Sequence, residues 1–167
     1  LARVALARRD ASIARTEAAL AQEANPARPV TAFVEARVLH DQGKYDDALP
    51  VFEKAVADSR KNSTPIPELH FYFGETLSRL NRRQEAIQQF AEEVRHFPEN
   101  TRARASLATL YQGTGQSELA DSTIADMMRA SPTPEAYALA ARLWRSFGKS
   151  RQAEAVRVES RRLFGNG

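Results

Sequence analysis

The sequence predicts an all-α fold, an α-solenoid of stacked antiparallel helix hairpins, because small residues recur in two columns at a nearly constant spacing. The first column is Ala14, Ala48, Ala86, Ala120 and Ala153. The second lies twelve residues upstream and is Ala2, Ala36, Gly74, Ala108 and Ala141. Successive members of each column are 34, 38, 34 and 33 residues apart. Paired helices approach closely only where the side chains at their crossing are small. The pattern therefore indicates an internal repeat of helix pairs.

Larger apolar residues and turn formers keep the same phase as the small columns. One equivalent position holds Leu39, Leu77, Tyr111 and Trp144, and another holds Phe52, Phe90 and Ile124. We expect these side chains to fill the layer between helices. Predicted turn residues after the first helix of a unit are Gly43, Asn81, Gly115 and Gly148, and prolines after the second helix are Pro26, Pro98 and Pro132. Glycine or asparagine past a helix end, with proline beyond it, is a typical stop signal.

Two segments, 68–100 and 101–132, resemble the unit of the tetratricopeptide repeat family, a helix-turn-helix of 34 residues. The matching residues are Phe73, Gly74, Leu77, Ala86, Phe90 and Pro98 in the first segment, and Leu107, Ala108, Tyr111, Gly115 and Ala120 in the second. The resemblance covers nearly the whole chain. It implies a right-handed superhelix of about four full repeats after a truncated first one. Three residues depart from the family pattern: Glu35 replaces a leucine, Glu93 a small residue and Arg104 an aromatic.

The predicted helices follow the order of the repeats. Their expected ranges are 1–9 and 11–24, 30–42 and 46–59, 68–80 and 83–97, 101–112 and 117–130, and 134–146 and 150–164. The repeat units span about 1–28, 29–66, 67–100, 101–133 and 134–167, and we expect them to build one domain. Segment 60–67 carries the extra residues of the longest spacing and is either a tolerated insertion or a contact loop. The shortened first unit predicts that further sequence precedes Leu1.

The composition limits the function classes. The chain has a formal net charge of +3, with 20 arginines and only four lysines. Enrichment in arginine and alanine agrees with a GC-rich bacterial genome, and a modest positive charge does not by itself indicate nucleic-acid binding. The absence of cysteine excludes disulfides and thiolate metal sites. No apolar run reaches the ~18 residues of a membrane span, and no signal peptide is recognisable. We expect a soluble protein, cytoplasmic or periplasmic.

No catalytic or metal-binding pattern stands out in the sequence. The three histidines share no i, i+4 face, so a zinc site is not expected. His70 is predicted to pack inside, His96 to lie near a helix end and His40 to line the inner surface. Segment 113–117 follows a helix rather than a strand and is predicted to be a repeat turn, not a phosphate loop. Acidic pairs at 46–47 and 92–93 are interpreted as a helix start and an exposed face. We expect neither enzyme activity nor a cofactor.

The predicted functional surface is the concave groove lined by the first helix of each unit. In the resembled family this groove binds extended peptides or helices. The groove candidates are Phe33, Arg37, His40, Phe71, Glu75, Arg79, Arg102, Thr109, Gln112, Arg142 and Arg145. Phenylalanines beside arginines suit an apolar anchor with an acidic or carboxylate group. The sharper hypothesis is therefore an acidic peptide. The alternative is that Phe33 and Phe71 are core residues and the arginines a solvated wall.

The leading prediction is a protein-interaction scaffold without catalysis, whose partner is a protein or peptide. The alternative is a structural accessory domain of a longer enzyme or of a secretion or assembly protein. A less favoured third class is nucleic-acid binding by the arginine-rich segment 142–162, which lacks interleaved aromatics other than Trp144. The lysine and asparagine set with which some family members clamp chaperone tails is not matched. Arg157, Arg161 and Arg162 are expected on a solvated end face, and the oligomeric state stays open.

Overall fold

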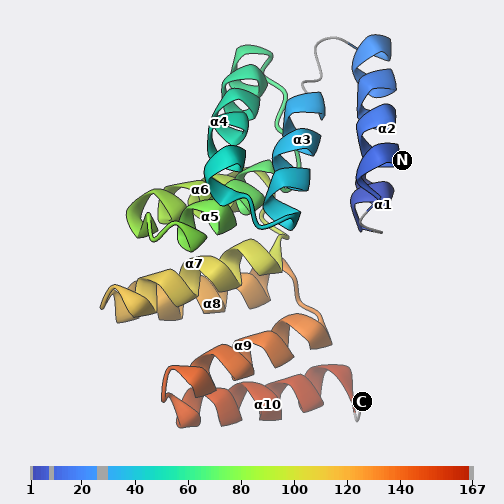
Figure 1. The fold of residues 1–167 in the computed structure, drawn as a ribbon. Helices are drawn as coiled ribbons and strands as arrows, with labels where there is room; N and C mark the ends of the chain where they lie inside the picture. Colours follow the sequence, from blue (N-terminus) through green and yellow to red (C-terminus); the bar gives the residue numbers. More distant parts are fainter. Residues whose placement is uncertain (1, 8–9, 26–29, 166–167) are drawn as a thin grey trace. The chain divides into compact units, whose positions relative to one another are not determined.

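The computed structural model describes residues 2–7, 10–25 and 30–165, which form helices joined by loops, without any strand among them (Figure 1). The helices are α1 (Ala2–Ala7), α2 (Ala11–Ala24), α3 (Val30–Asp41), α4 (Tyr45–Lys61), α5 (Leu69–Arg79), α6 (Arg83–His96), α7 (Thr101–Gly113), α8 (Ser117–Ala130), α9 (Pro134–Ser146) and α10 (Ser150–Phe164). The all-α helical-repeat prediction is confirmed, and the helix bounds agree with the expected ranges to within two residues. The expectations for Pro26 and for residues 1, 8–9 and 166–167 lie outside the described residues.

The chain divides into two compact units, residues Leu1–Gln89 and Phe90–Gly167, with the boundary inside α6. Unit 1 contains α1 to α5 and the first half of α6. Unit 2 contains the second half of α6 and α7 to α10. The expectation that the five repeats build one domain stays a prediction.

Unit 1 is built from antiparallel helix pairs. Helix α1 packs against α2 and α3 against α4, while α2 also contacts α3 and α4 contacts α5. One apolar cluster joins the first three helices and consists of Ala2, Ala5, Leu6, Ala14, Ala18, Val34 and Val38. Phe52 from α4 stacks on Phe73 from α5, with ring centroids 5.6 Å apart. Stacked aromatic pairs add to the area burial that stabilises such contacts.

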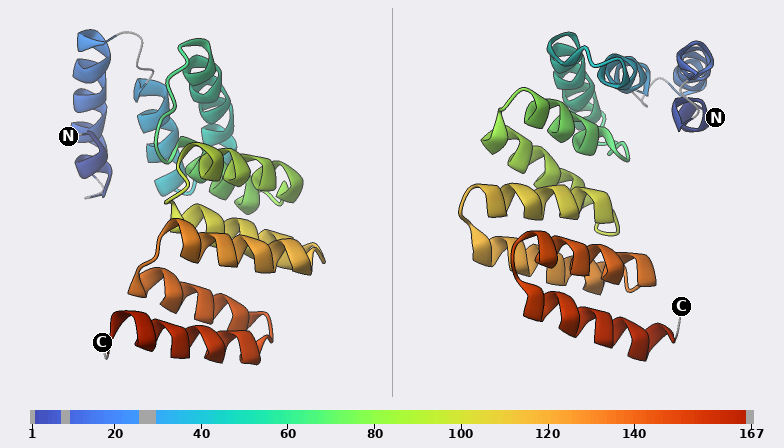
Figure 2. Two further views of the ribbon diagram at one scale, coloured as in Figure 1. Left: turned by 180° about the vertical axis from the view of Figure 1, so that it is seen from behind. Right: turned by 60° about the horizontal axis from the view of Figure 1, so that its bottom comes forward.

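Unit 2 repeats the arrangement with α7 against α8 and α9 against α10 (Figure 2). Helix α9 also contacts α7 and α8, so the two hairpins share one core. Its members are Ala108, Ile124, Met127, Tyr137, Ala140, Ala141, Trp144, Ala153 and Val156. A polar clamp reinforces the packing, because Asp121 on α8 accepts hydrogen bonds from Trp144 Nε1 at 2.8 Å and from Lys149 Nζ at 2.5 Å.

The small residues of both columns are buried, as predicted. The alanines of the two columns are at most 9% exposed, and Gly74 is buried as well. A larger side chain at these positions would collide with the partner helix, since packed interiors leave no room for added volume. The two columns thus explain why the helices of a hairpin pack closely.

Four turns between the helices of a hairpin close in the same way. Gly43, Asn81, Gly115 and Gly148 all have positive φ, between 60° and 78°. In each turn the amide of the residue after the positive-φ residue donates a hydrogen bond to the carbonyl five residues before it. The acceptors are Leu39, Leu77, Tyr111 and Trp144. The pairing is a Schellman motif, in which a left-handed residue ends a helix and satisfies its last carbonyls. The apolar column identified in the sequence therefore also marks the last turn of each first helix.

The three departures from the family pattern each have a partner. Glu35 forms a two-pronged ion pair with Arg15, at 2.6 and 3.1 Å, which joins α2 to α3. Arg104 donates from Nε to the carbonyl of Pro98 at 3.0 Å. Glu93 is 0% exposed and accepts a hydrogen bond from Asn100 Nδ2 at 2.9 Å. The expectation that residues 92–93 lie on an exposed face is therefore wrong for Glu93, because the loop to α7 folds over its carboxylate.

The loop of the long second spacing, residues 60–67, is ordered by its own hydrogen bonds. Ser59 Oγ donates to the carbonyl of Thr64 at 2.7 Å, and Thr64 N donates to the carbonyl of Ser59 at 3.1 Å. Ile66 is buried and anchors the loop. Glu68 then takes a left-handed conformation with φ 70° directly before α5. The inserted residues are thus held by hydrogen bonds within the loop and by the burial of Ile66.

Candidate protein-interaction site

The two phenylalanines predicted to line the groove are core residues. Phe33 on α3 is 1% exposed and Phe71 on α5 is 2% exposed. An apolar anchor for a peptide needs side-chain area that is open to the ligand. Phe33 and Phe71 are therefore core residues, as the alternative interpretation of the sequence held. Neither side chain offers an apolar anchor on the surface of unit 1.

Arg37 on α3 is neutralised within its own unit. Its Nε donates to both carboxylate oxygens of Asp41, at 2.9 and 3.0 Å. Its guanidinium carbon lies 3.4 Å from the centre of the Tyr72 ring, the geometry of a cation–π contact. An arginine that is paired with a carboxylate and stacked on a ring has little charge left for a ligand.

His40 occupies the centre of a polar and aromatic cluster in unit 1. Its Nδ1 lies 2.9 Å from Thr76 Oγ1, and its Nε2 lies 3.8 Å from Glu75 Oε2. The rings of Tyr45 and Tyr72 contact it edge-on, with centroids 5.4 and 5.5 Å away. Burial lowers the pKa of His40 below its ordinary value; Arg37 and Arg79 also lower it, and Asp41 opposes the shift. The cluster is thus internally satisfied, and its surroundings disfavour the charged imidazolium of His40.

Two of the three α7 candidates in unit 2 form hydrogen bonds within their own helix or with the start of the next one. Thr109 Oγ1 donates to the carbonyl of Ala105 at 2.8 Å, and Gln112 Oε1 accepts from Ser117 Oγ at 2.8 Å. Arg102 is exposed. These residues leave hydrogen-bonding capacity at the surface but no concentration of charge.

The α9 candidates, Arg142 and Arg145, differ from those on α3. Both side chains are exposed, and neither forms an ion pair or hydrogen bond with the part of the chain that the structure describes. They follow one another by three residues, so they share one side of the helix. Their charges are therefore available to a ligand.

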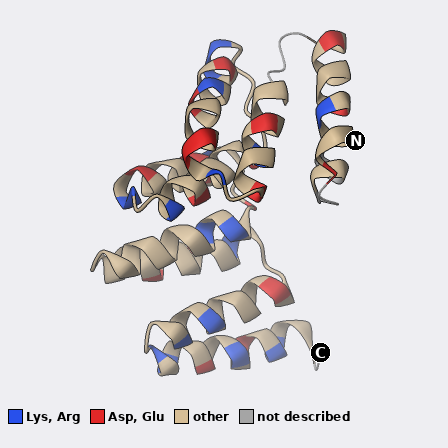
Figure 3. Ribbon diagram, viewed as in Figure 1, with Lys and Arg blue, Asp and Glu red and all other residues tan. Residues whose placement is uncertain are grey.

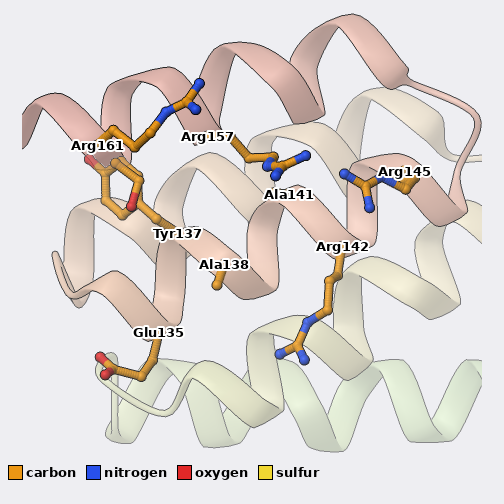
Figure 4. A pocket seen from close by; sticks show the side chains of 9 residues that line it. Glu135, Tyr137, Ala138, Ala141, Arg142, Arg145, Arg157 and Arg161 are labelled. Atoms are coloured by element: carbon orange, nitrogen blue, oxygen red, sulfur yellow. The ribbon is translucent and has the colours of Figure 1, made fainter. Parts of the chain in front are cut away.

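A pocket of about 700 Å³ lies between α9 and α10 and adds two arginines to this pair (Figure 4). Arg142 and Arg145 come from α9, whereas Arg157 and Arg161 come from α10. Tyr137, Ala138 and Ala141 also line the pocket. Figure 3 shows basic residues along both helices of this hairpin. The sequence predicted Arg157 and Arg161 on an end face, but not that they join the α9 arginines around one cavity.

The other histidines lie where the sequence predicted them, with His70 buried and His96 at the end of α6. His70 Nδ1 lies 2.7 Å from Gln89 Oε1, a contact that holds it in place. Within the ranges 2–7, 10–25 and 30–165, no group of three His, Asp or Glu side chains is arranged to hold a metal ion. None of the helices described has the length and apolarity needed to cross a membrane.

A family model described as tetratricopeptide repeat matches residues 77–143, which run from the end of α5 through most of α9. Over this segment the chain matches the tetratricopeptide repeat. The matched segment contains the Asn81 and Gly115 turns and Arg142 of the candidate site. No curated protein matches the sequence.

Solved structures of tetratricopeptide repeat proteins share the fold over nearly the whole chain. TTC0263, a thermophilic TPR protein from Thermus thermophilus, is 18% identical, with a TM-score of 0.68 over 98% of this chain and 88% of that one. MamA from Desulfovibrio magneticus RS-1 is 16% identical, with a TM-score of 0.66 over 97% and 90%. YrrB is 17% identical, with a TM-score of 0.63 over 99% and 84%. At these identities the similarity establishes the fold.

Proposed function

We propose that this protein is a non-catalytic interaction scaffold that binds an acidic peptide segment of a partner protein on the first-helix face of unit 2. That face is formed by the groove candidates Arg102, Thr109, Gln112, Arg142 and Arg145. The observation that carries the proposal is the exposure of Arg142 and Arg145 without an ion pair to the described part of the chain. Guanidinium groups in this state recognise carboxylates through charge-assisted and often bidentate hydrogen bonds.

The similarity to known structures supports a peptide as the ligand. The crystal structure of YrrB is described as that of a TPR protein with an unusual peptide-binding site. Helical repeats present extended surfaces whose exposed side chains vary while the packing positions stay small or apolar. In this chain the same division holds, since Ala108 and Ala141 are buried while Arg142 and Arg145 are exposed.

Titration with labelled peptides tests the proposal. The probe is an extended peptide rich in Asp and Glu, and its counterpart carries Asn and Gln instead. We expect the acidic peptide to bind and the amide peptide to bind more weakly. Reversal of charge in Arg142→Glu should weaken acidic-peptide binding by about tenfold, because a like charge then faces the ligand.

A matched variant, Arg151→Glu, makes the same charge change on α10 away from this face, since Arg151 is exposed and does not line the pocket. It should bind the acidic peptide almost as the unchanged protein does. Equal binding by Arg142→Glu, Arg151→Glu and the unchanged protein would reject the first-helix face of unit 2 as the binding surface.

A further inference from the structure

We infer that the pocket between α9 and α10, here called the α9–α10 pocket, binds an amphipathic acidic segment with an apolar side chain on its floor and carboxylates on its rim. This inference rests on the proposed function and names the kind of segment that the scaffold takes. It adds the second helix of the hairpin, α10, to the recognition surface. The floor, the rim and the size of the pocket each favour such a segment.

The floor of the pocket is apolar. Tyr137 and Ala141 are buried members of the unit 2 core, and Ala138 is exposed beside them. The Tyr137 ring is held edge-on against Phe164, with centroids 5.4 Å apart. Two alanines beside the Tyr137 ring leave a hollow that an aliphatic side chain can fill. Burial of such a side chain in a preformed pocket is the usual source of binding free energy in an anchored contact.

The rim of the pocket carries an excess of positive charge from both helices. Arg142, Arg145, Arg157 and Arg161 surround the floor, and Glu135 lies at the edge (Figure 4). Arg157 and Arg161 are partly balanced by Glu154, at 3.7 and 3.6 Å, but their side chains remain 54% and 60% exposed. Such long, exposed ion pairs exchange easily for a better carboxylate. The rim therefore favours a ligand with several carboxylates.

The size and surroundings of the pocket favour a peptide over a nucleic acid. A volume of about 700 Å³ holds a few side chains rather than a folded domain. Single-stranded nucleic acids bind on exposed aromatic rings. The ring of Trp144 is buried and donates to Asp121, and Tyr137 is only 9% exposed.

The test uses a fluorescein-labelled peptide of about twelve residues, the span of a short amphipathic helix, in which paired leucines are flanked by glutamates. Two matched peptides replace either the glutamates with glutamine or the leucines with serine. We expect the unchanged protein to bind the first peptide more tightly than either matched peptide. The double variant Arg157→Ser/Arg161→Ser should weaken binding roughly tenfold, at two- to fivefold for each exposed arginine.

Two further variants separate the pocket from general charge effects. Arg151→Ser/Arg162→Ser removes the same charge from α10 at exposed residues outside the pocket lining, and its affinity should stay within about twofold of the unchanged protein. Ala138→Trp keeps every charge but fills the floor, and it should abolish binding of the leucine peptide. Circular dichroism confirms that each variant is folded.

Several outcomes would overturn the inference. One is equal weakening by the two arginine pairs, which would indicate attraction to net charge only. Another is equal binding of the glutamate and glutamine peptides. Tighter binding of a single-stranded RNA oligonucleotide, lost in Arg157→Ser/Arg161→Ser, would assign the pocket to nucleic acid. In a further outcome, Arg142→Glu loses peptide binding while Arg157→Ser/Arg161→Ser binds like the unchanged protein. That result would reject the α9–α10 pocket as the binding site but leave the proposed function intact.

Discussion

The carboxylate of Glu93 holds the loop between α6 and α7 against the end of α6. Asn100 Nδ2 donates to Glu93 Oε1 at 2.9 Å, while Asn100 Oδ1 accepts from the amide of Ala103 at 3.1 Å. Asn100 thus caps α7 and at the same time satisfies a carboxylate that is fully buried. A buried carboxylate is tolerated only when its oxygens are hydrogen-bonded.

We predict that Glu93→Ala lowers the free energy of unfolding by about 2 kcal/mol, because the Asn100 amide loses its acceptor and a cavity remains. Glu93→Gln keeps one acceptor oxygen and nearly the same volume, so its loss should be smaller. Urea unfolding followed by circular dichroism measures both variants. Unfolding of Glu93→Ala at the same urea concentration as the unchanged protein would contradict this role.

We predict that His40 makes unit 1 less stable in mild acid. Its pKa is lowered in the folded state by burial, so the unfolded chain binds a proton first as the pH falls. The stabilisation is fully present above the ordinary histidine pKa and is lost as the pH falls through it. Groups facing His40 are Arg37 and Asp41 on α3, Tyr45 on α4, and Tyr72, Glu75 and Arg79 on α5.

The measurement compares urea midpoints at about pH 7.5 and about pH 5, on either side of the ordinary histidine pKa, for the unchanged protein and for His40→Gln. The unchanged protein should lose more stability between the two pH values than the variant does. Identical pH dependence in both proteins would show that His40 is not the titrating group. Other titrating residues affect both proteins equally, so the difference isolates His40.

The separation of core from surface residues was the least predictable property at this scale. Helical spacing put Phe33 and Arg37 on one face because they are four residues apart, yet Phe33 is 1% exposed and the Arg37 side chain is 15% exposed. Helical spacing gives the direction in which a side chain points, but not how far the neighbouring helix covers it. The same limit hid the burial of Glu93, whose partner is seven residues away across a loop.

At the scale of helices and turns, Asn81 is the exception among the four hairpin turns. It has a φ of 60°, where the other three turns have glycine. A side chain in the left-handed region is strained, and asparagine tolerates the strain better than most residues but less well than glycine. Asn81 is exposed, so its side chain contributes no packing.

We therefore predict that Asn81→Gly raises the free energy of unfolding by about 0.5 kcal/mol, and that the reciprocal change Gly115→Ala lowers it by about 1 kcal/mol. A Cβ at Gly115 meets no atom within 4 Å, so the loss would come from backbone strain alone. Thermal unfolding of both variants provides the measurement. Destabilisation by Asn81→Gly would mean that the asparagine side chain has a role beyond the turn.

The helices themselves were predictable because several sequence signals agree at each end. Thr133 caps α9 by accepting from Ala136 N at 3.2 Å, with Pro134 at the first helical position, as the sequence of that turn indicates. Helix α4 ends two residues beyond the expected range because no strong stop signal follows Ser59 until the loop at 62–67. Agreement of capping, turn and apolar spacing locates an element better than any one of them.

For the whole molecule, the lone tryptophan provides a test of the one-domain prediction. Trp144 is the only tryptophan of the chain and lies in the core of unit 2. Its fluorescence reports on unit 2, whereas circular dichroism at helical wavelengths reports on the helices of both units. If the five repeats build one cooperative domain, the two urea curves coincide. A circular dichroism transition that begins well before the fluorescence change would show that unit 1 unfolds separately.

The repeat architecture could be predicted from the sequence, but the binding surface could not. Ten small residues in one phase are a redundant signal, and the burial of Ala48 or Ala120 is decided by geometry that every repeat shares. A binding site depends on exceptions to the repeat, such as Arg157, which occupies the position held by Phe52 and Phe90. An exception occurs once, so no periodicity reveals whether it faces solvent or a neighbouring arginine.

The common closure of the four hairpin turns has an evolutionary consequence. Each bend is fixed by two main-chain hydrogen bonds and one residue of positive φ, and it requires no particular side chain from its neighbours. A gene segment encoding one hairpin can therefore be copied in tandem and still fold at its new location. Natural selection is then free to diversify the outward residues of each copy, which makes lengthening the array an accessible route to new partners.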